Sequence, residues 1–140
     1  LPEDAEPATD IEISFSSNVL AGWIWTGETY ERTTNGVTHR WVDRAGARTQ
    51  INVPTLVVMF VEQYTASPPA GVSGSSVPAS QTLGSGRALV FAGGMVVEGR
   101  WSRYRITDNF ELTNTDGSAI LVPPGRSWIS LVPTGRRISW

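Results

Sequence analysis

Tight turns constrain this sequence more than any other feature. Asn35-Gly36 and Gly93-Gly94 each separate two runs typical of strands, and both central residues of a type I′ hairpin turn need positive φ. No window of eleven or more residues keeps apolar side chains at the spacing of a helix, because Gly or Pro interrupts almost every candidate. The chain is therefore predicted to fold from β-hairpins with little helix.

The turn at Asn35-Gly36 fixes the register of the hairpin that it closes. A two-residue turn places Glu31 opposite Arg40 and Tyr30 opposite Trp41. Both pairs would stabilise the hairpin, the first by opposite charge and the second by aromatic contact, each by about 0.2–1 kcal/mol. This agreement predicts two adjacent strands within residues 30–41.

An aromatic face follows if Gly27-Glu28 is also a tight turn, since a third strand then joins this hairpin. Left exposed, the face would be a flat platform that stacks on sugar rings or on a Pro-rich peptide; covered, it would belong to the core. The residues that share this face, and so form the candidate ligand-binding set, are Trp23, Trp25, Tyr30, Arg32, His39 and Trp41.

The turn at Gly93-Gly94 predicts a second hairpin in which Phe91 pairs with Val96 and Arg87 pairs with Arg100. Two arginines facing each other would repel unless a carboxylate neutralises them. The surrounding charges allow either a solvated salt-bridge network or a site that holds an anion between guanidinium groups. The candidate anion-binding residues are Arg87, Glu98, Arg100 and Arg103.

The remaining segments complete a single β-rich domain over residues 11–140. Residues 56–61 are apolar without alternation, which is typical of a central strand covered on both faces. Residues 1–10 are predicted to be a flexible arm or linker, and the low-complexity residues 66–80 a mobile insert. With later turns the chain holds about eight short strands, so its fold class is mainly β, an antiparallel sandwich or a partly open barrel.

Several classes of site are excluded or disfavoured by composition. The chain has no cysteine and one histidine, which leaves no thiolate or multi-histidine metal site, and no metal or cofactor is predicted. The glycines of residues 84–94 match no phosphate-binding spacing, and no G-x-S-x-G elbow is present. No catalytic residue is assigned. The catalytic alternative left open is His39 with Asp43, or a pair of carboxylates.

Charge and hydropathy limit the partners. Five of the thirteen acidic residues precede residue 13. The rest of the chain holds eight acidic residues and eleven arginines, a positive charge too small and too scattered for a nucleic-acid surface. The longest apolar run, residues 56–61, falls far short of the roughly 20 residues that cross a bilayer. The chain starts at Leu1, and we expect it to be part of a longer protein.

Three strings carry a resemblance to a known family: "YERTTNGVTHRWVDRAG", "GSGRALVFAGGMVVEGRW" and "DGSAILVPPGRSWISLVP". They resemble the C-terminal domain of the YerB-like family, bacterial proteins of unknown function that are described as lipoproteins. The likeness covers roughly residues 11–133. The positions that carry it are Tyr30, Arg32, Gly36, His39, Asp43, Gly84, Gly86, Phe91, Gly94, Gly99, Trp101, Gly125 and Trp128.

The resemblance implies an extracytoplasmic protein of the bacterial cell envelope, membrane-anchored at full length, with an N-terminal domain that lies outside this chain. It supplies no catalytic residues. We therefore expect a non-catalytic accessory or interaction module, whose partners would be its own N-terminal domain, a cell-wall polymer or an envelope protein. The alternatives are a cell-wall-directed hydrolase or transferase, and a module that binds a glycan or an anionic polymer.

Overall fold

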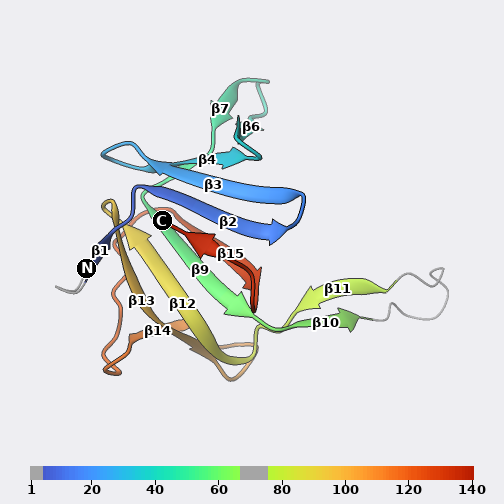
Figure 1. Cartoon of the computed structure of the whole chain (residues 1–140), viewed down its shortest axis with the longest axis vertical. Helices are drawn as coiled ribbons and strands as arrows, with labels where there is room; N and C mark the ends of the chain where they lie inside the picture. Colours follow the sequence, from blue (N-terminus) through green and yellow to red (C-terminus); the bar gives the residue numbers. More distant parts are fainter. Residues whose placement is uncertain (1–4, 67–75) are drawn as a thin grey trace.

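Two β-sheets pack face to face in the computed structural model, which describes residues 5–66 and 76–140 (Figure 1). The described residues contain no helix, so none of them could cross a membrane as an apolar helix. The predicted fold class, a mainly β sandwich, is confirmed. The first sheet has the strand order β1 (Glu6–Pro7), β13 (Met95–Arg103), β12 (Gly84–Ala92), β9 (Thr55–Val61), β15 (Ser127–Pro133), with β14 (Glu111–Asn114) also on β13.

The second sheet is formed largely by the first third of the chain. Its order is β16 (Ile138–Ser139), β2 (Asp10–Ser16), β3 (Val19–Trp25), β4 (Tyr30–Thr34), β5 (Val37–Thr38), with β8 (Asn52–Val53) also on β4. Two hairpins project from the sandwich, and Figure 1 shows them pointing away from it. They are β6 (Arg40–Val42) with β7 (Arg48–Gln50), and β10 (Gln63–Ala66) with β11 (Val77–Ser80).

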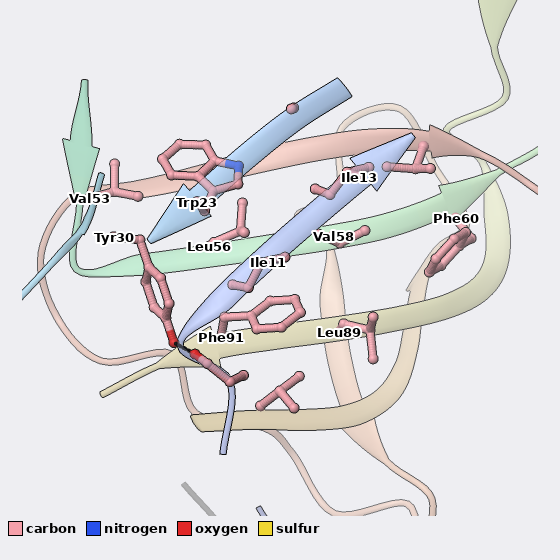
Figure 2. Packing of buried hydrophobic residues seen from close by; sticks show 14 residues of the cluster. Ile11, Ile13, Trp23, Tyr30, Val53, Leu56, Val58, Phe60, Leu89 and Phe91 are labelled. Atoms are coloured by element: carbon pink, nitrogen blue, oxygen red, sulfur yellow. Dashed lines mark hydrogen bonds between the residues drawn. The ribbon is translucent and has the colours of Figure 1, made fainter. Parts of the chain in front are cut away.

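The main core lies between the two sheets. Trp23 and Tyr30 from the second sheet meet Leu56 and Phe91 from the first, and all four are fully buried (Figure 2). A second apolar cluster covers the other face of the first sheet, where Trp101 packs with apolar residues of β9 and β12. The centre of the first sheet is therefore apolar on both faces, which explains why the sequence of β9 lacks alternation.

Strand β9 occupies the centre of the first sheet, as its apolar sequence predicts. Every residue from Thr55 to Val61 is buried. One edge of β9 pairs with the antiparallel strand β12, and the other edge pairs with β15. The pairing with β15 is parallel, with Ser127 beside Thr55. This pair is the parallel exception among the antiparallel strand pairs of the described sheets.

The three predicted tight turns are confirmed, and the turn at Gly27-Glu28 places Trp25 opposite Tyr30. Asn35 and Gly36 have φ of 49° and 75°, and Gly93 and Gly94 have φ of 61° and 75°. The second hairpin has the predicted register, with Phe91 opposite Val96.

The first hairpin departs from its predicted register after two pairs. Tyr30 pairs with Val53, not with Trp41, and Glu31 pairs with Asn52, not with Arg40. The chain leaves the sheet after Thr38 and makes a turn in which Asp43 Oδ1 accepts hydrogen bonds from two backbone N–H groups, of residues 45 and 47, at 2.8 and 2.9 Å. This turn closes hairpin β6–β7, where Trp41 lies opposite Thr49.

Two predicted flexible regions need correction. Within residues 1–10, those from 5 onward lie against the sandwich: β1 pairs with β13, and the buried Ala8 donates its N–H to the carbonyl of Gly94 at 2.7 Å. Residues 1–4 lie outside the described residues. Of the predicted insert 66–80, Ala66 and residues 77–80 are paired strands, while residues 67–75 also lie outside the described part.

Candidate functional site

A cleft of about 500 Å³ opens where hairpin β6–β7 and strand β8 face the start of β15. We call it the aromatic cleft. Two indoles and several uncharged polar side chains line it, together with one arginine. Its lining residues are Trp41, Thr49, Gln50, Ile51, Asn52, Val53, Arg126, Ser127 and Trp128.

The two tryptophans of the aromatic cleft come from distant parts of the chain. Trp41 lies on the projecting strand β6 and is 50% exposed. Trp128 lies on β15, is half-buried, and meets the buried Trp23 edge to face with ring centroids 5.4 Å apart. One indole is thus held by the core, while the other stands on a hairpin outside the sandwich.

Arg32 lies beside the aromatic cleft, between two indole rings. Its guanidinium carbon is 4.5 Å from the ring centroid of Trp128 and 5.3 Å from that of Trp23. Burial lowers the pKa of Arg32 from its ordinary value, although a guanidinium remains charged at neutral pH. The buried Arg32 Nε and Trp23 Nε1 have no hydrogen-bond partner among the described residues.

Arg126 is the charged residue that lines the aromatic cleft. Its Nη2 donates to Asn52 Oδ1 at 3.3 Å, and the Asn52 amide in turn donates to the Gln50 carbonyl at 3.3 Å. No carboxylate belongs to the lining. Glu31 pairs with Asn52 across the strands but does not line the cleft. The charge that the cleft offers a ligand is therefore positive.

The predicted aromatic face does not form one platform. Trp23 and Tyr30 are buried in the core, and Trp25 packs on Tyr30 with ring centroids 4.8 Å apart. His39 is partly buried, with its Nδ1 3.4 Å from Thr34 Oγ1. Of the predicted set, Trp41 lines the cleft, and Arg32 with Trp23 contacts its Trp128 wall.

Tyr30 has a structural role that can be measured. Its hydroxyl donates to the Ala8 carbonyl at 3.0 Å and so ties the N-terminal segment to the core. Burial raises the pKa of Tyr30 from 10.0 to about 12.

We expect the domain to lose stability as the pH rises from about 10 to about 12, because the unfolded chain then loses the Tyr30 proton first. At about 1.4 kcal/mol per pH unit, the loss reaches roughly 2–3 kcal/mol. Tyr30→Phe should cost about 1 kcal/mol at neutral pH, through its lost hydrogen bond, and should reduce the alkaline loss. Urea unfolding at several pH values measures both effects. Tyr104→Phe, at a side chain that is 74% exposed, is the matched control and should change neither.

The predicted anion-binding residues are divided between the two faces of the first sheet. Arg87 forms a bidentate salt bridge with Glu98, in which Nε donates to Oε1 at 2.7 Å and Nη2 donates to Oε2 at 2.9 Å. The pair raises the pKa of Arg87 and lowers the pKa of Glu98. Arg100 donates to Ser85 Oγ on the same face at 3.2 Å.

Arg103 is an odd-numbered residue of β13, so it points to the opposite face from Arg100. There its guanidinium lies over Phe110 and its Nε donates to the Asp108 carbonyl at 2.9 Å. The four predicted residues therefore do not converge on one point. Their contacts match the salt-bridge interpretation better than the anion site, which stays a prediction.

Three residues of the catalytic alternative have structural partners. Asp43 accepts the two backbone bonds that close β6–β7, and His39 lies against Thr34. Asp108 pairs with Arg105 at 3.2 Å. Among residues 5–66 and 76–140 no group of three metal-ligating side chains is arranged around a common point.

Trp41 is the one lining residue of the cleft that belongs to a candidate set, and the most important of those that the sets lack are Trp128 and Arg126. The only signal for Trp128 was its place in the Gly125-x-x-Trp128 motif of the family resemblance. Its approach to Trp23 depends on which strand lies beside β9, and local sequence patterns do not specify that order.

Comparison with known proteins identifies relatives of the whole domain. Residues 11–129 match the family model described as "Protein of unknown function (DUF3048) C-terminal domain". The crystal structure of the YerB protein from Bacillus subtilis superimposes with a TM-score of 0.73 at 19% sequence identity, over 96% of this chain and 45% of that one. At this identity the likeness shows the fold alone. The chain thus spans less than half of the structure that it matches. The comparison with curated proteins found no match.

Proposed function

Because the chain belongs to the family of DUF3048 C-terminal domains, as its resemblance to YerB-like proteins predicted, we propose that it is a non-catalytic interaction module of a bacterial cell-envelope protein. The module binds an envelope component through the aromatic cleft. The extracytoplasmic location is part of the proposal and rests on the family resemblance. The remainder of the full-length protein would carry the module and anchor it.

The observation that carries the proposal is the pair of tryptophans in the aromatic cleft. The core of this domain buries Trp23 and Trp101 almost completely, yet Trp41 is held half-exposed on a hairpin outside the sandwich. An exposed large apolar side chain stabilises the fold less than a buried one, because part of its surface stays in water. The position of Trp41 therefore suits ligand binding better than stability. A concave site with aromatic walls and a few polar groups is typical of ligand binding.

The chemistry of the carboxyl groups favours binding over hydrolysis. A general acid at neutral pH needs a raised pKa. Where the carboxyl groups are shifted, the direction is the opposite: Arg87 lowers the pKa of Glu98, and hydrogen bonds from Ser118 lower the pKa of Asp116. These carboxylates are held ionised by local partners, as structural residues are.

Co-sedimentation with purified bacterial cell walls, with their attached polymers, tests this function. The domain should pellet with the walls, and Trp41→Ala should weaken the binding severalfold or more, because burying a large apolar side chain contributes about 1.5–3 kcal/mol. Tyr104→Ala removes an exposed aromatic side chain outside the cleft and should pellet as the unchanged domain does.

Two results would contradict the proposal. Equal sedimentation of Trp41→Ala would show that the aromatic cleft is not the binding surface. Release of soluble sugar or peptide from the walls, at a rate that rises with protein concentration, would establish the catalytic alternative.

A further inference from the structure

We infer that the aromatic cleft binds a saccharide that carries an anionic group, a carboxylate or a phosphate, with a sugar ring stacked on Trp41 and the anion bonded to Arg126. The inference rests on the proposed function and deepens it by naming the chemistry of the ligand. Three features of the cleft support it: the shape of its walls, its uncharged polar groups and its charge.

The shape of the cleft suits a ring-shaped ligand. Its volume of about 500 Å³ lies within the range of about 300–1,000 Å³ that is typical of small-ligand sites. Trp41 offers a half-exposed indole to the cleft, and Trp128 also lines it. An indole face is apolar and carries negative electrostatic potential, so it attracts the C–H face of a sugar ring.

The polar groups of the cleft suit the rim of hydroxyls around such a ring. Thr49 and Ser127 offer hydroxyls. Gln50 and Asn52 offer amides, each of which already donates one hydrogen bond to a backbone carbonyl and has a second N–H left for a ligand. Each of these groups can both donate and accept a hydrogen bond, as a sugar hydroxyl can. A Pro-rich peptide would use the same aromatic walls, but it has no N–H at proline and few partners for these side chains.

The charge of the cleft selects an anion. Arg126 is the charged residue in the lining, and its one hydrogen bond within the described residues goes to a neutral amide oxygen, that of Asn52. Behind Trp128 lies the Arg32 guanidinium, which has no salt bridge to a carboxylate within the described part of the chain. Hydrogen bonds between a guanidinium and a carboxylate or phosphate are about twice as strong as neutral ones.

Two buried donors add to this positive end of the cleft. Arg32 Nε and Trp23 Nε1 lack partners in the described part of the chain, although buried polar groups in proteins are almost always bonded. Both groups belong to side chains that contact Trp128. They reinforce a local electrostatic field that favours negative charge, while Arg126 makes the direct contact.

Binding to defined oligosaccharides tests the inference. The full chain is titrated with a galacturonic acid hexamer, with a phosphomannan oligosaccharide and with neutral chitohexaose, and tryptophan fluorescence and calorimetry report the affinity. At least one anionic ligand should bind about tenfold more tightly than the neutral one, the factor expected of one charge-assisted contact. The ligand that shows this preference assigns the anion as carboxylate or phosphate.

Matched variants separate charge from stacking. Arg126→Gln should remove the preference for the anionic ligand without changing the affinity for the neutral one, and Arg126→Lys should retain part of it. Arg44→Gln, in the exposed turn of β6–β7, removes an arginine outside the cleft lining and should change nothing. Trp41→Ala should weaken both kinds of saccharide about equally.

Each failure of the inference has its own signature. If neutral chitohexaose binds as tightly as the anionic ligands, or if decaproline binds more tightly than they do, the ligand of the cleft is not an anionic saccharide. If tripolyphosphate binds as tightly as the anionic saccharide, the sugar ring does not contribute to binding and the inference is wrong. If these results appear while sedimentation with cell walls still depends on Trp41, the inference falls and the proposed function stands. If no wall material binds either, both fall.

Discussion

Replacing Trp23 by alanine should lower the free energy of unfolding by roughly 3–5 kcal/mol, the usual cost of removing a buried large aromatic side chain. Trp23 is completely buried between the sheets, where it contacts Trp128 and the guanidinium of Arg32. Because the stability of a domain is typically about 5–15 kcal/mol, this loss should lower the melting temperature by more than about 10 °C. Thermal unfolding followed by circular dichroism measures it.

The neighbouring residue provides the control for Trp23. Ile24 lies on the same strand with its side chain on the outer face, 49% exposed. Ile24→Ala should cost less than about 1 kcal/mol. If Trp23→Ala were no more destabilising than Ile24→Ala, the core between the sheets could not have the packing described here.

A valine at position 99 should destabilise the domain by about 3 kcal/mol or more, beyond the usual range for overpacking, because the obstacle is backbone. A Cβ on Gly99 would overlap the Thr113 carbonyl and lie 2.6 Å from Ile120 Cδ1. Strand β14 would have to move away from β13, which would break the pairing of Gly99 with Asn114. The midpoint of urea unfolding measures the loss.

Arg100→Val is the matched control for this substitution. It places the same β-branched side chain one residue further along β13, on an exposed site. The variant should stay within about 0.5 kcal/mol of the unchanged domain. A destabilisation equal to that of Gly99→Val would mean that valine disturbs β13 in general and that the contact with Thr113 is unimportant.

The features that the sequence predicts well are those that depend on neighbouring residues. The turn at Gly93-Gly94 sets the register of its hairpin because positive φ at two adjacent positions leaves few alternatives. The buried strand β9 is predicted by its uninterrupted apolar residues. In both cases the determining interactions lie within the segment itself.

The features that escaped prediction depend on competition between distant segments. Trp41 and Val53 could both have become the partner of Tyr30, and the predicted aromatic pair favoured Trp41. In the structure residues 40–50 form a separate hairpin, whose turn is held by the hydrogen bonds at Asp43, and Val53 pairs with Tyr30. A local pairing preference of less than about 1 kcal/mol cannot decide between two such arrangements.

The candidate site was predicted in part, for the same reason. Trp41 belonged to the predicted ligand-binding set, but Trp23 and Tyr30 of that face are covered by the core, and Trp41 lies on a separate hairpin. Trp128 and Arg126 join it only because β15 pairs with β9, at the opposite edge of β9 from β12. Residues that meet through strand order alone leave no local pattern in the sequence.

The parallel pair of β9 and β15 has a consequence for how the domain is made. Thr55 can pair with β15 only after Ser127 has been synthesised. In the same way, β1 can pair with β13 only after Met95 and Val96 have been synthesised. Contacts between residues so distant in the chain slow folding, because a large loop must close before any stabilising contact forms. Until β15 reaches it, the apolar β9 has no partner on that side, and an unpaired apolar strand edge is prone to aggregation.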